Sequence, residues 1–153
     1  MNKSALFSDD RKYRYWLSRI WDDTKPKVMF IGLNPSTANE DKDDNTIRRV
    51  IGYARDWGYG GVYMCNLFPF VSTDPKLLTD ISTHDNDKIL NAISRECAAC
   101  VFAWGAFKQA KEQAARVIKM FPDALVLTFN NDGSPHHPLR LSKSLQPQKF
   151  VAR

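Results

Sequence analysis

The strongest constraint on the fold of this chain is a short apolar run that ends abruptly in a polar turn. Val28–Ile31 has the length and composition of a strand buried on both faces of a sheet. Gly32 ends the run, and Pro35 then biases Asn34 toward extended backbone. In parallel α/β sheets, ligands bind beyond the carboxyl ends of the strands. We therefore expect the turn at Asn34 to lie at a binding site, with an ordinary surface turn as the alternative.

Three more apolar runs follow, each separated from the next by a stretch with helical periodicity. This alternation predicts an α/β fold, specifically a three-layer αβα sandwich around a four-stranded parallel central sheet. The aromatic-rich segment Tyr13–Trp21 favours an additional N-terminal antiparallel strand. We expect residues 1–153 to form a single domain. The further strands are predicted at Val62–Leu67, Cys100–Ala103 and Leu125–Thr128, and the helices are predicted to begin near Asn45, Asp85 and Ala106.

Composition excludes several classes of protein. No apolar run approaches the roughly 20 residues of a membrane span, and the N-terminus lacks the apolar core of a signal peptide. We therefore expect a cytoplasmic monomer that does not contact membranes. The 3 cysteines are too few for a disulfide framework. Cys97 and Cys100 have redox-type spacing, but no second Cys or His pair completes a zinc site, so we expect buried thiols and neither a metal nor a cofactor.

The net charge of +5 is unevenly distributed along the chain. No acidic residue follows Asp132, and a basic stretch of this kind suits a phosphate backbone. The segment Glu40–Asp44 is acidic instead, and it either points away from DNA, caps a helix, or uses Asp43 or Asp44 as a carboxylate or metal ligand. The residues predicted to bind nucleic acid are Arg48, Arg49, Arg140 and Lys143.

Three segments that follow the expected strands carry a resemblance to a known family. They are Gly32-Leu33-Asn34-Pro35-Ser36, Trp104-Gly105 and Gly133–Leu139. Together they resemble a bacterial and phage family of uncharacterised proteins with a GLNPS turn and a GxPxHPL segment. That family in turn resembles the uracil-DNA glycosylase superfamily, whose members carry a related Asn-Pro or Asp-Pro turn and a His-Pro-Ser or Asn-Pro-Ser loop.

The resemblance implies roles in the cleavage of an N-glycosidic bond. Asn34 takes the position of the residue that orients water, and His137, with His136 as the alternative, that of the donor to the base oxygen. Phe68 or Phe70 would stack on a flipped base. Leu139 would wedge into the base stack. With the strand-end Asn66, the implied substrate-binding residues are Gly32, Leu33, Pro35, Ser36, Asn66, Phe68 and Leu139.

Two features depart from the superfamily pattern. Asn34 replaces an aspartate, so it can hold a water molecule but cannot act as a base at neutral pH. The sequence after Pro138 is Leu-Arg-Leu-Ser, which lacks the usual Ser-Pro pair. Because Asn34 and His137 lie on loops, we expect neither to be needed for folding.

The leading functional hypothesis is a DNA glycosylase-like hydrolase that flips and releases an unusual or modified base. A nucleotide- or nucleoside-processing enzyme and a non-catalytic nucleic-acid binding module are the alternatives.

Overall fold

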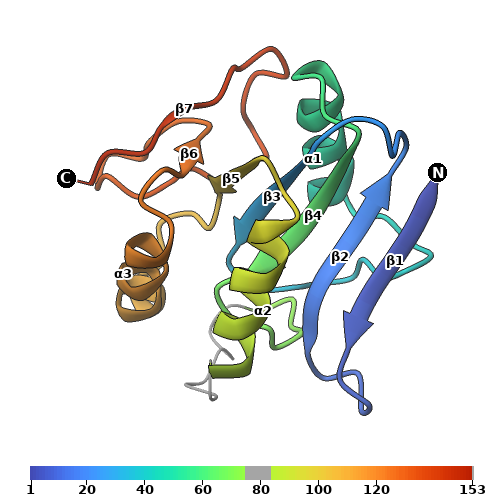
Figure 1. Ribbon diagram of the computed structural model, residues 1–153. Helices are drawn as coiled ribbons and strands as arrows, with labels where there is room; N and C mark the ends of the chain where they lie inside the picture. Colours follow the sequence, from blue (N-terminus) through green and yellow to red (C-terminus); the bar gives the residue numbers. More distant parts are fainter. Residues whose placement is uncertain (75–83, 153) are drawn as a thin grey trace.

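The computed structural model describes residues 1–74 and 84–152, and these residues form one seven-stranded sheet (Figure 1). The strand order is β1-β2-β4-β3-β5-β6-β7. The strands are β1 (Asn2–Phe7), β2 (Arg14–Ile20), β3 (Lys27–Gly32), β4 (Gly61–Asn66), β5 (Ala99–Phe102), β6 (Leu125–Val126) and β7 (Gln148–Lys149). The helices are α1 (Asn45–Asp56), α2 (His84–Arg95), the short 3-10 helix η2 (Lys108–Ala110) and α3 (Lys111–Met120).

The sheet is mixed, which corrects the predicted fold class. Strand β3 pairs in parallel with β4 and β5, and β5 pairs in parallel with β6. The pairings β1–β2, β2–β4 and β6–β7 are antiparallel. The prediction of a uracil-DNA glycosylase-like sandwich on a four-stranded parallel sheet is therefore wrong. Antiparallel strands extend the sheet at both edges (Figure 1).

The edge strands β1 and β7 were not predicted, because their own sequences carry little strand signal. β1 reads Asn-Lys-Ser-Ala-Leu-Phe, without the clear alternation of a half-buried strand. Its conformation comes from its partner, since it pairs with β2 over its whole length with one irregularity before Phe7. β7 is only two residues long and pairs with β6 across a large sequence separation. Local patterns cannot predict pairings of this kind.

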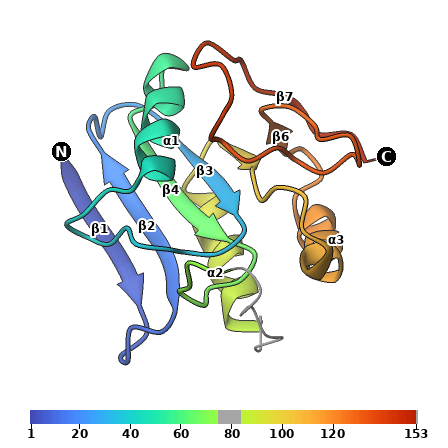
Figure 2. The same ribbon diagram turned by 180° about the vertical axis from the view of Figure 1, so that it is seen from behind.

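Helices cover both faces of the sheet. α1 packs on one face, where Val28 and Phe30 of β3 point, and α2 and α3 pack on the other, where Met29 and Ile31 point (Figures 1 and 2). All four of these side chains are fully buried. This is why β3 is a continuous apolar run, since each of its faces meets a helix layer.

The N-terminal ends of α1 and α3 fix the positions of Asp44 and Phe107. Asp44 caps α1 by accepting a hydrogen bond from the Ile47 N–H at 2.9 Å, so the predicted start near Asn45 is confirmed. α3 begins at Lys111, later than the predicted Ala106. Gly105 has φ 83°, and Phe107 is extended with φ −117° and ψ 122°. These conformations keep the segment after β5 out of the helix. None of the helices described here has the length and apolarity needed to cross a membrane.

Candidate functional site

A cavity of about 390 Å³ lies at the carboxyl ends of β3, β4 and β5. The structure brings together there the strand-end residues that the sequence singled out, because parallel strands end at the same edge of a sheet. Three of its polar lining residues are Asn34, Asn66 and His137. The other predicted site residues that line it are Gly32, Leu33, Ser36 and His136, and Asp44 and Asn130 contribute further polar groups.

Backbone hydrogen bonds join the loops that form the cavity. The Gly105 N–H donates to the Pro135 carbonyl at 2.9 Å, which ties the turn after β5 to the histidine segment. The left-handed φ of Gly105 suits glycine and makes this approach possible. The His136 N–H donates to the Thr128 carbonyl at 2.9 Å, so the segment that carries both histidines folds back along the end of the sheet.

Asn34 holds two loops together as well as facing the cavity. Its Nδ2 donates to the carbonyls of Ser72 at 2.8 Å, Pro35 at 3.1 Å and Phe70 at 3.4 Å. Carbonyl oxygens only accept, so these partners define which side-chain atom is the nitrogen. Among the described residues no group donates to Oδ1, which leaves that acceptor for a ligand. Asn34 therefore links its own turn to the Phe70–Ser72 segment, a contact that the sequence did not predict.

His137 is held as a neutral imidazole that presents a donor. Its Nδ1 accepts a hydrogen bond from the Leu139 N–H at 3.1 Å, so the ring proton of the neutral form sits on Nε2. Burial lowers the pKa of His137 below 6.5, and the neighbouring His136 lowers it further, whereas Asp44 opposes the shift. The ring is therefore mostly uncharged at neutral pH.

His136 presents the opposite face of an imidazole. Its Nδ1 donates to the His137 carbonyl at 2.7 Å, because a carbonyl can only accept. In the neutral form its Nε2 is then an acceptor. The two adjacent histidines thus supply the same cavity with one N–H donor and one nitrogen acceptor.

Asp44 is the acidic residue in the described lining of the cavity. Two other acidic residues of the segment, Asp43 and Glu40, pair with arginines elsewhere. Asp43 accepts from the fully buried Arg19 at 2.8 Å, and Glu40 pairs with Arg11 at 2.9 Å. The described residues contain no group of three or more His, Cys, Asp or Glu side chains placed to hold a metal. Of the alternatives for this segment, the structure supports a helix cap whose carboxylate reaches the cavity.

The aromatic wall is not the predicted one. Phe68 is 8% exposed and belongs to the core, and neither it nor Phe70 is among the described residues that line the cavity. Trp104 and Phe107 line it instead. Phe107 is 38% exposed, which suits a side chain that contacts a ligand at the rim. The sequence signal for this wall is an aromatic residue shortly after the Trp104-Gly105 turn. The helix predicted from Ala106 includes Phe107 and therefore hides this signal.

Two further predicted substrate residues lie outside this cavity. Pro35 is buried, and its carbonyl accepts from the Ser72 N–H at 3.0 Å and from Asn34. Leu139 faces a second pocket, beside the first. The apolar part of the first cavity comes instead from Leu33, Ile47 and Met64.

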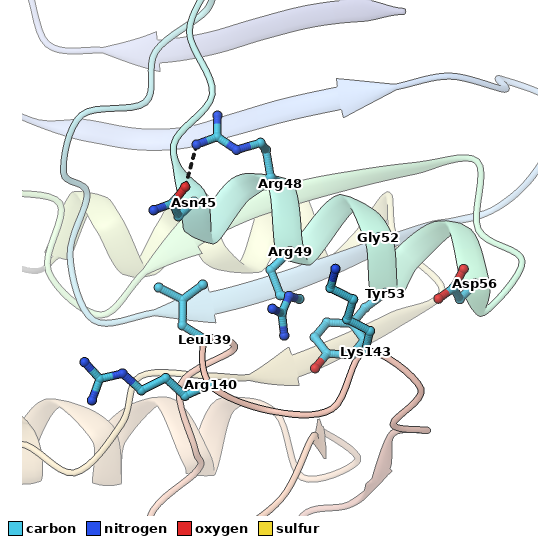
Figure 3. Close-up of a pocket in the computed structure, with 9 residues that line it drawn as sticks. All are labelled: Asn45, Arg48, Arg49, Gly52, Tyr53, Asp56, Leu139, Arg140 and Lys143. Atoms are coloured by element: carbon cyan, nitrogen blue, oxygen red, sulfur yellow. Dashed lines mark hydrogen bonds between the residues drawn. The ribbon is translucent and has the colours of Figure 1, made fainter.

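The second pocket, of about 590 Å³, contains all four predicted nucleic-acid-binding residues (Figure 3). Arg48 and Arg49 leave α1 in different directions, and Arg49 reaches the segment that carries Arg140 and Lys143 (Figure 3). Its Nη1 donates to the Leu141 carbonyl at 2.7 Å. The described residues that line it are Asn45, Arg48, Arg49, Gly52, Tyr53, Asp56, Leu139, Arg140 and Lys143.

The basic pocket adjoins the first cavity at the start of α1. Asp44, Thr46 and Ile47 line the first cavity, whereas Asn45, Arg48 and Arg49 line the basic pocket. The segment from His136 to Arg140 likewise contributes its two histidines to the first cavity and Leu139 and Arg140 to the basic pocket.

Arg140 has a left-handed φ of 63°, a conformation with a cost of about 1–2 kcal/mol for a residue other than glycine. In the described residues, none of the four cations forms an ion pair with a carboxylate.

A family model described as "Protein of unknown function (DUF1643)" matches residues 14–139. Comparisons with curated proteins and with solved structures found no match.

Proposed function

We propose that this chain, which belongs to the DUF1643 family of proteins of unknown function, hydrolyses the N-glycosidic bond of an unusual or modified base in DNA. The observation that carries the proposal is the pairing, in one cavity, of a neutral N–H donor at His137 with the carboxylate of Asp44. The N–H donor stabilises negative charge and the carboxylate stabilises positive charge, and cleavage of an N-glycosidic bond produces an anionic base and a cationic sugar.

The reaction separates charge. The bond between C1′ of the sugar and the base nitrogen breaks, its electron pair leaves with the base, and the sugar becomes cationic. The Nε2–H of His137 would stabilise negative charge on a base oxygen, and Asp44 would stabilise the sugar. A water molecule adds its oxygen to C1′, and one of its protons finally neutralises the base. The Oδ1 of Asn34, to which no described residue donates, suits a role in holding that water.

A proton acceptor for the water is also present. Asn34 is an amide and cannot take a proton at neutral pH. Among the described residues that line the cavity, the Nε2 of His136 and the carboxylate of Asp44 can each accept a proton. Both are therefore candidates for the general base.

The basic pocket supports a polyanionic substrate. The pocket adjoins the cavity, and its four cations have no carboxylate partner in the described residues, which suits the phosphates that flank a flipped nucleotide. The turn from Gly32 to Ser36 and the His137-Pro138 segment also resemble the motif loops of the uracil-DNA glycosylase superfamily. The chain does not have the predicted fold of that superfamily, so the fold gives no support to this activity. The proposal is based on the motifs and on the chemistry of the cavity.

Base release under single-turnover conditions tests the proposal. The substrates are oligonucleotides that carry uracil, hypoxanthine, a mismatched thymine or a hypermodified pyrimidine. We expect wild-type protein to release one of these bases, and His137→Ala to slow release by about 10²–10³-fold, as loss of one donor to a developing anion does. Asn91→Ala, an exposed site on α2, is the matched control and should keep the wild-type rate. Release from no substrate, or a folded His137→Ala variant with full rate, would refute the proposal.

A second candidate is an enzyme that acts on a free nucleotide or nucleoside. It is favoured by the side-by-side arrangement of a cavity of about 390 Å³ and a basic pocket, which suits a base and its phosphate in one small molecule. Release of base from nucleoside 5′-monophosphates, with none from oligonucleotides, would favour this candidate. Salt-dependent DNA binding without release of any base would favour a binding module.

A further inference from the structure

Arg14 is a buried cation that contacts the cavity residue Asn66 and has no acidic partner in the described part of the chain. The residue is 3% exposed, and in the described part of the chain it forms no ion pair. Its Nη1 donates to the Ala38 carbonyl at 3.2 Å, and its Nη2 donates to Asn66 Oδ1 at 3.3 Å. Its Nε has no hydrogen-bond partner among the residues that the structure describes. Burying an unpaired charge is costly, so its presence there calls for a role.

The charge of Arg14 persists under physiological conditions. Desolvation lowers the pKa of Arg14 to about 10, which still leaves the guanidinium protonated at neutral pH. Asp44 opposes this shift and is the carboxylate that acts most strongly on Arg14. Asp44 nevertheless makes no direct contact with it that meets the distance of an ion pair.

Asn66 transmits this charge to the cavity. A guanidinium only donates hydrogen bonds, so the contact with Arg14 identifies the Asn66 oxygen and leaves Nδ2 on the other side of the amide. That Nδ2 lies above Gly32, only 3.0 Å from where a Cβ would stand, and both residues line the cavity. The Asn66 carbonyl also accepts from Asn86 Nδ2 at 2.9 Å, which anchors the residue at the end of β4.

Polarisation by a cation strengthens the donor at the far side of an amide. The Nδ2–H of Asn66 therefore faces the cavity with the positive potential of Arg14 behind it. A Cβ at Gly32 would stand 2.7 Å from Met64 Cε and 3.0 Å from Asn66 Nδ2, so only glycine fits beneath this donor. His137 adds a second N–H to the same cavity, and Asp44 supplies the opposite charge.

We propose that Arg14 is a positioning residue which, through Asn66, makes this cavity prefer the anionic form of a heterocyclic base over its neutral form. This inference rests on the proposed function, since the departing base is the group that becomes anionic during N-glycosidic cleavage. It adds the specificity of the site, namely a heterocyclic ring whose oxygen or nitrogen carries negative charge.

Calorimetric titration with free bases tests the inference without any need for catalysis. The probes are 5-nitrouracil, an anion at neutral pH, and thymine, a neutral ring with a 5-substituent. We expect wild-type protein to bind 5-nitrouracil about 10–100-fold more tightly than thymine, the range for one charge-assisted hydrogen bond. Asn66→Asp should remove this preference, because it replaces the donor with a carboxylate that pairs with Arg14.

Two changes at Arg14 separate its charge from its structural role. Arg14→Lys retains the cation and should retain the preference, whereas Arg14→Gln retains a hydrogen-bond donor and should lose it. Thermal melting shows whether each variant is folded, and Asn66→Asp serves as the second route if Arg14→Gln does not fold. Equal binding of the two bases by wild type, binding of neither, or a preference that survives Asn66→Asp would overturn the inference. Base release from DNA is measured separately, so its failure alone leaves these titrations interpretable.

Discussion

Replacement of Asp44 separates two roles that the structure assigns to one carboxylate. Asp44 caps α1 through the Ile47 N–H and also places negative charge in the cavity. Asparagine caps helices about as well as aspartate, whereas alanine loses the cap at a cost of about 1 kcal/mol. Asp44→Asn therefore removes the charge and keeps the cap, and Asp44→Ala removes both.

The stability difference between these variants can be worked out from the cap alone. Any effect of the lost charge on α1 or on Arg14 is common to both changes, so it cancels in the comparison. For a chain of 153 residues, about 1 kcal/mol corresponds to about 2–4 °C in Tm. We expect Asp44→Ala to melt about 2–4 °C below Asp44→Asn, as measured by circular dichroism.

The charge has its own readouts. Asp44 raises the pKa of His137 against the effect of burial, so both variants should move this pKa further below 6.5, as measured by NMR titration of the ring. Both should also slow base release by about 10²–10³-fold, the cost of losing one electrostatic stabiliser of the transition state. An unchanged His137 titration together with a wild-type rate in folded Asp44→Asn would refute this account of the cavity.

Three further predictions follow from the same geometry. The pKa of His137 lies below 6.5 in the folded chain, so the unfolded chain binds this proton first as the pH falls. The free energy of unfolding of wild type should therefore decrease as the pH falls below 6.5, until the lowered pKa is passed. Urea melts of His137→Gln should show a smaller decrease. Asn34→Asp should lower Tm and base release together, because a carboxylate would face three carbonyl oxygens in place of an N–H donor; melting at or above the wild-type temperature would contradict this. Arg140→Ala and Lys143→Ala should each reduce the slope of log affinity against log salt for DNA by about 1, whereas the exposed Lys88→Ala on α2 should leave it unchanged. Equal slopes for all three would exclude the basic pocket as the phosphate site.

The sequence by itself was informative where each residue's surroundings are set locally. The apolar run of β3 and the cap at Asp44 depend on burial and on hydrogen bonds within a few residues, so both could be predicted. The positions of Asn34 and Asn66 at strand ends followed from the same periodicity. The family resemblance likewise rested on short contiguous motifs, and the family model covers residues 14–139.

The tertiary structure alone decided how distant segments meet. β1 and β7 are strands because of partners in the sheet, and their own residues carry no pattern that identifies those partners. The aromatic residues that line the cavity are Trp104 and Phe107 and not the predicted Phe68, because Phe68 packs in the core. Arg14 shows the physical reason most clearly. Its chemistry depends on burial and on an amide 52 residues away in the chain, and long-range contacts of this kind leave no trace in local sequence periodicity.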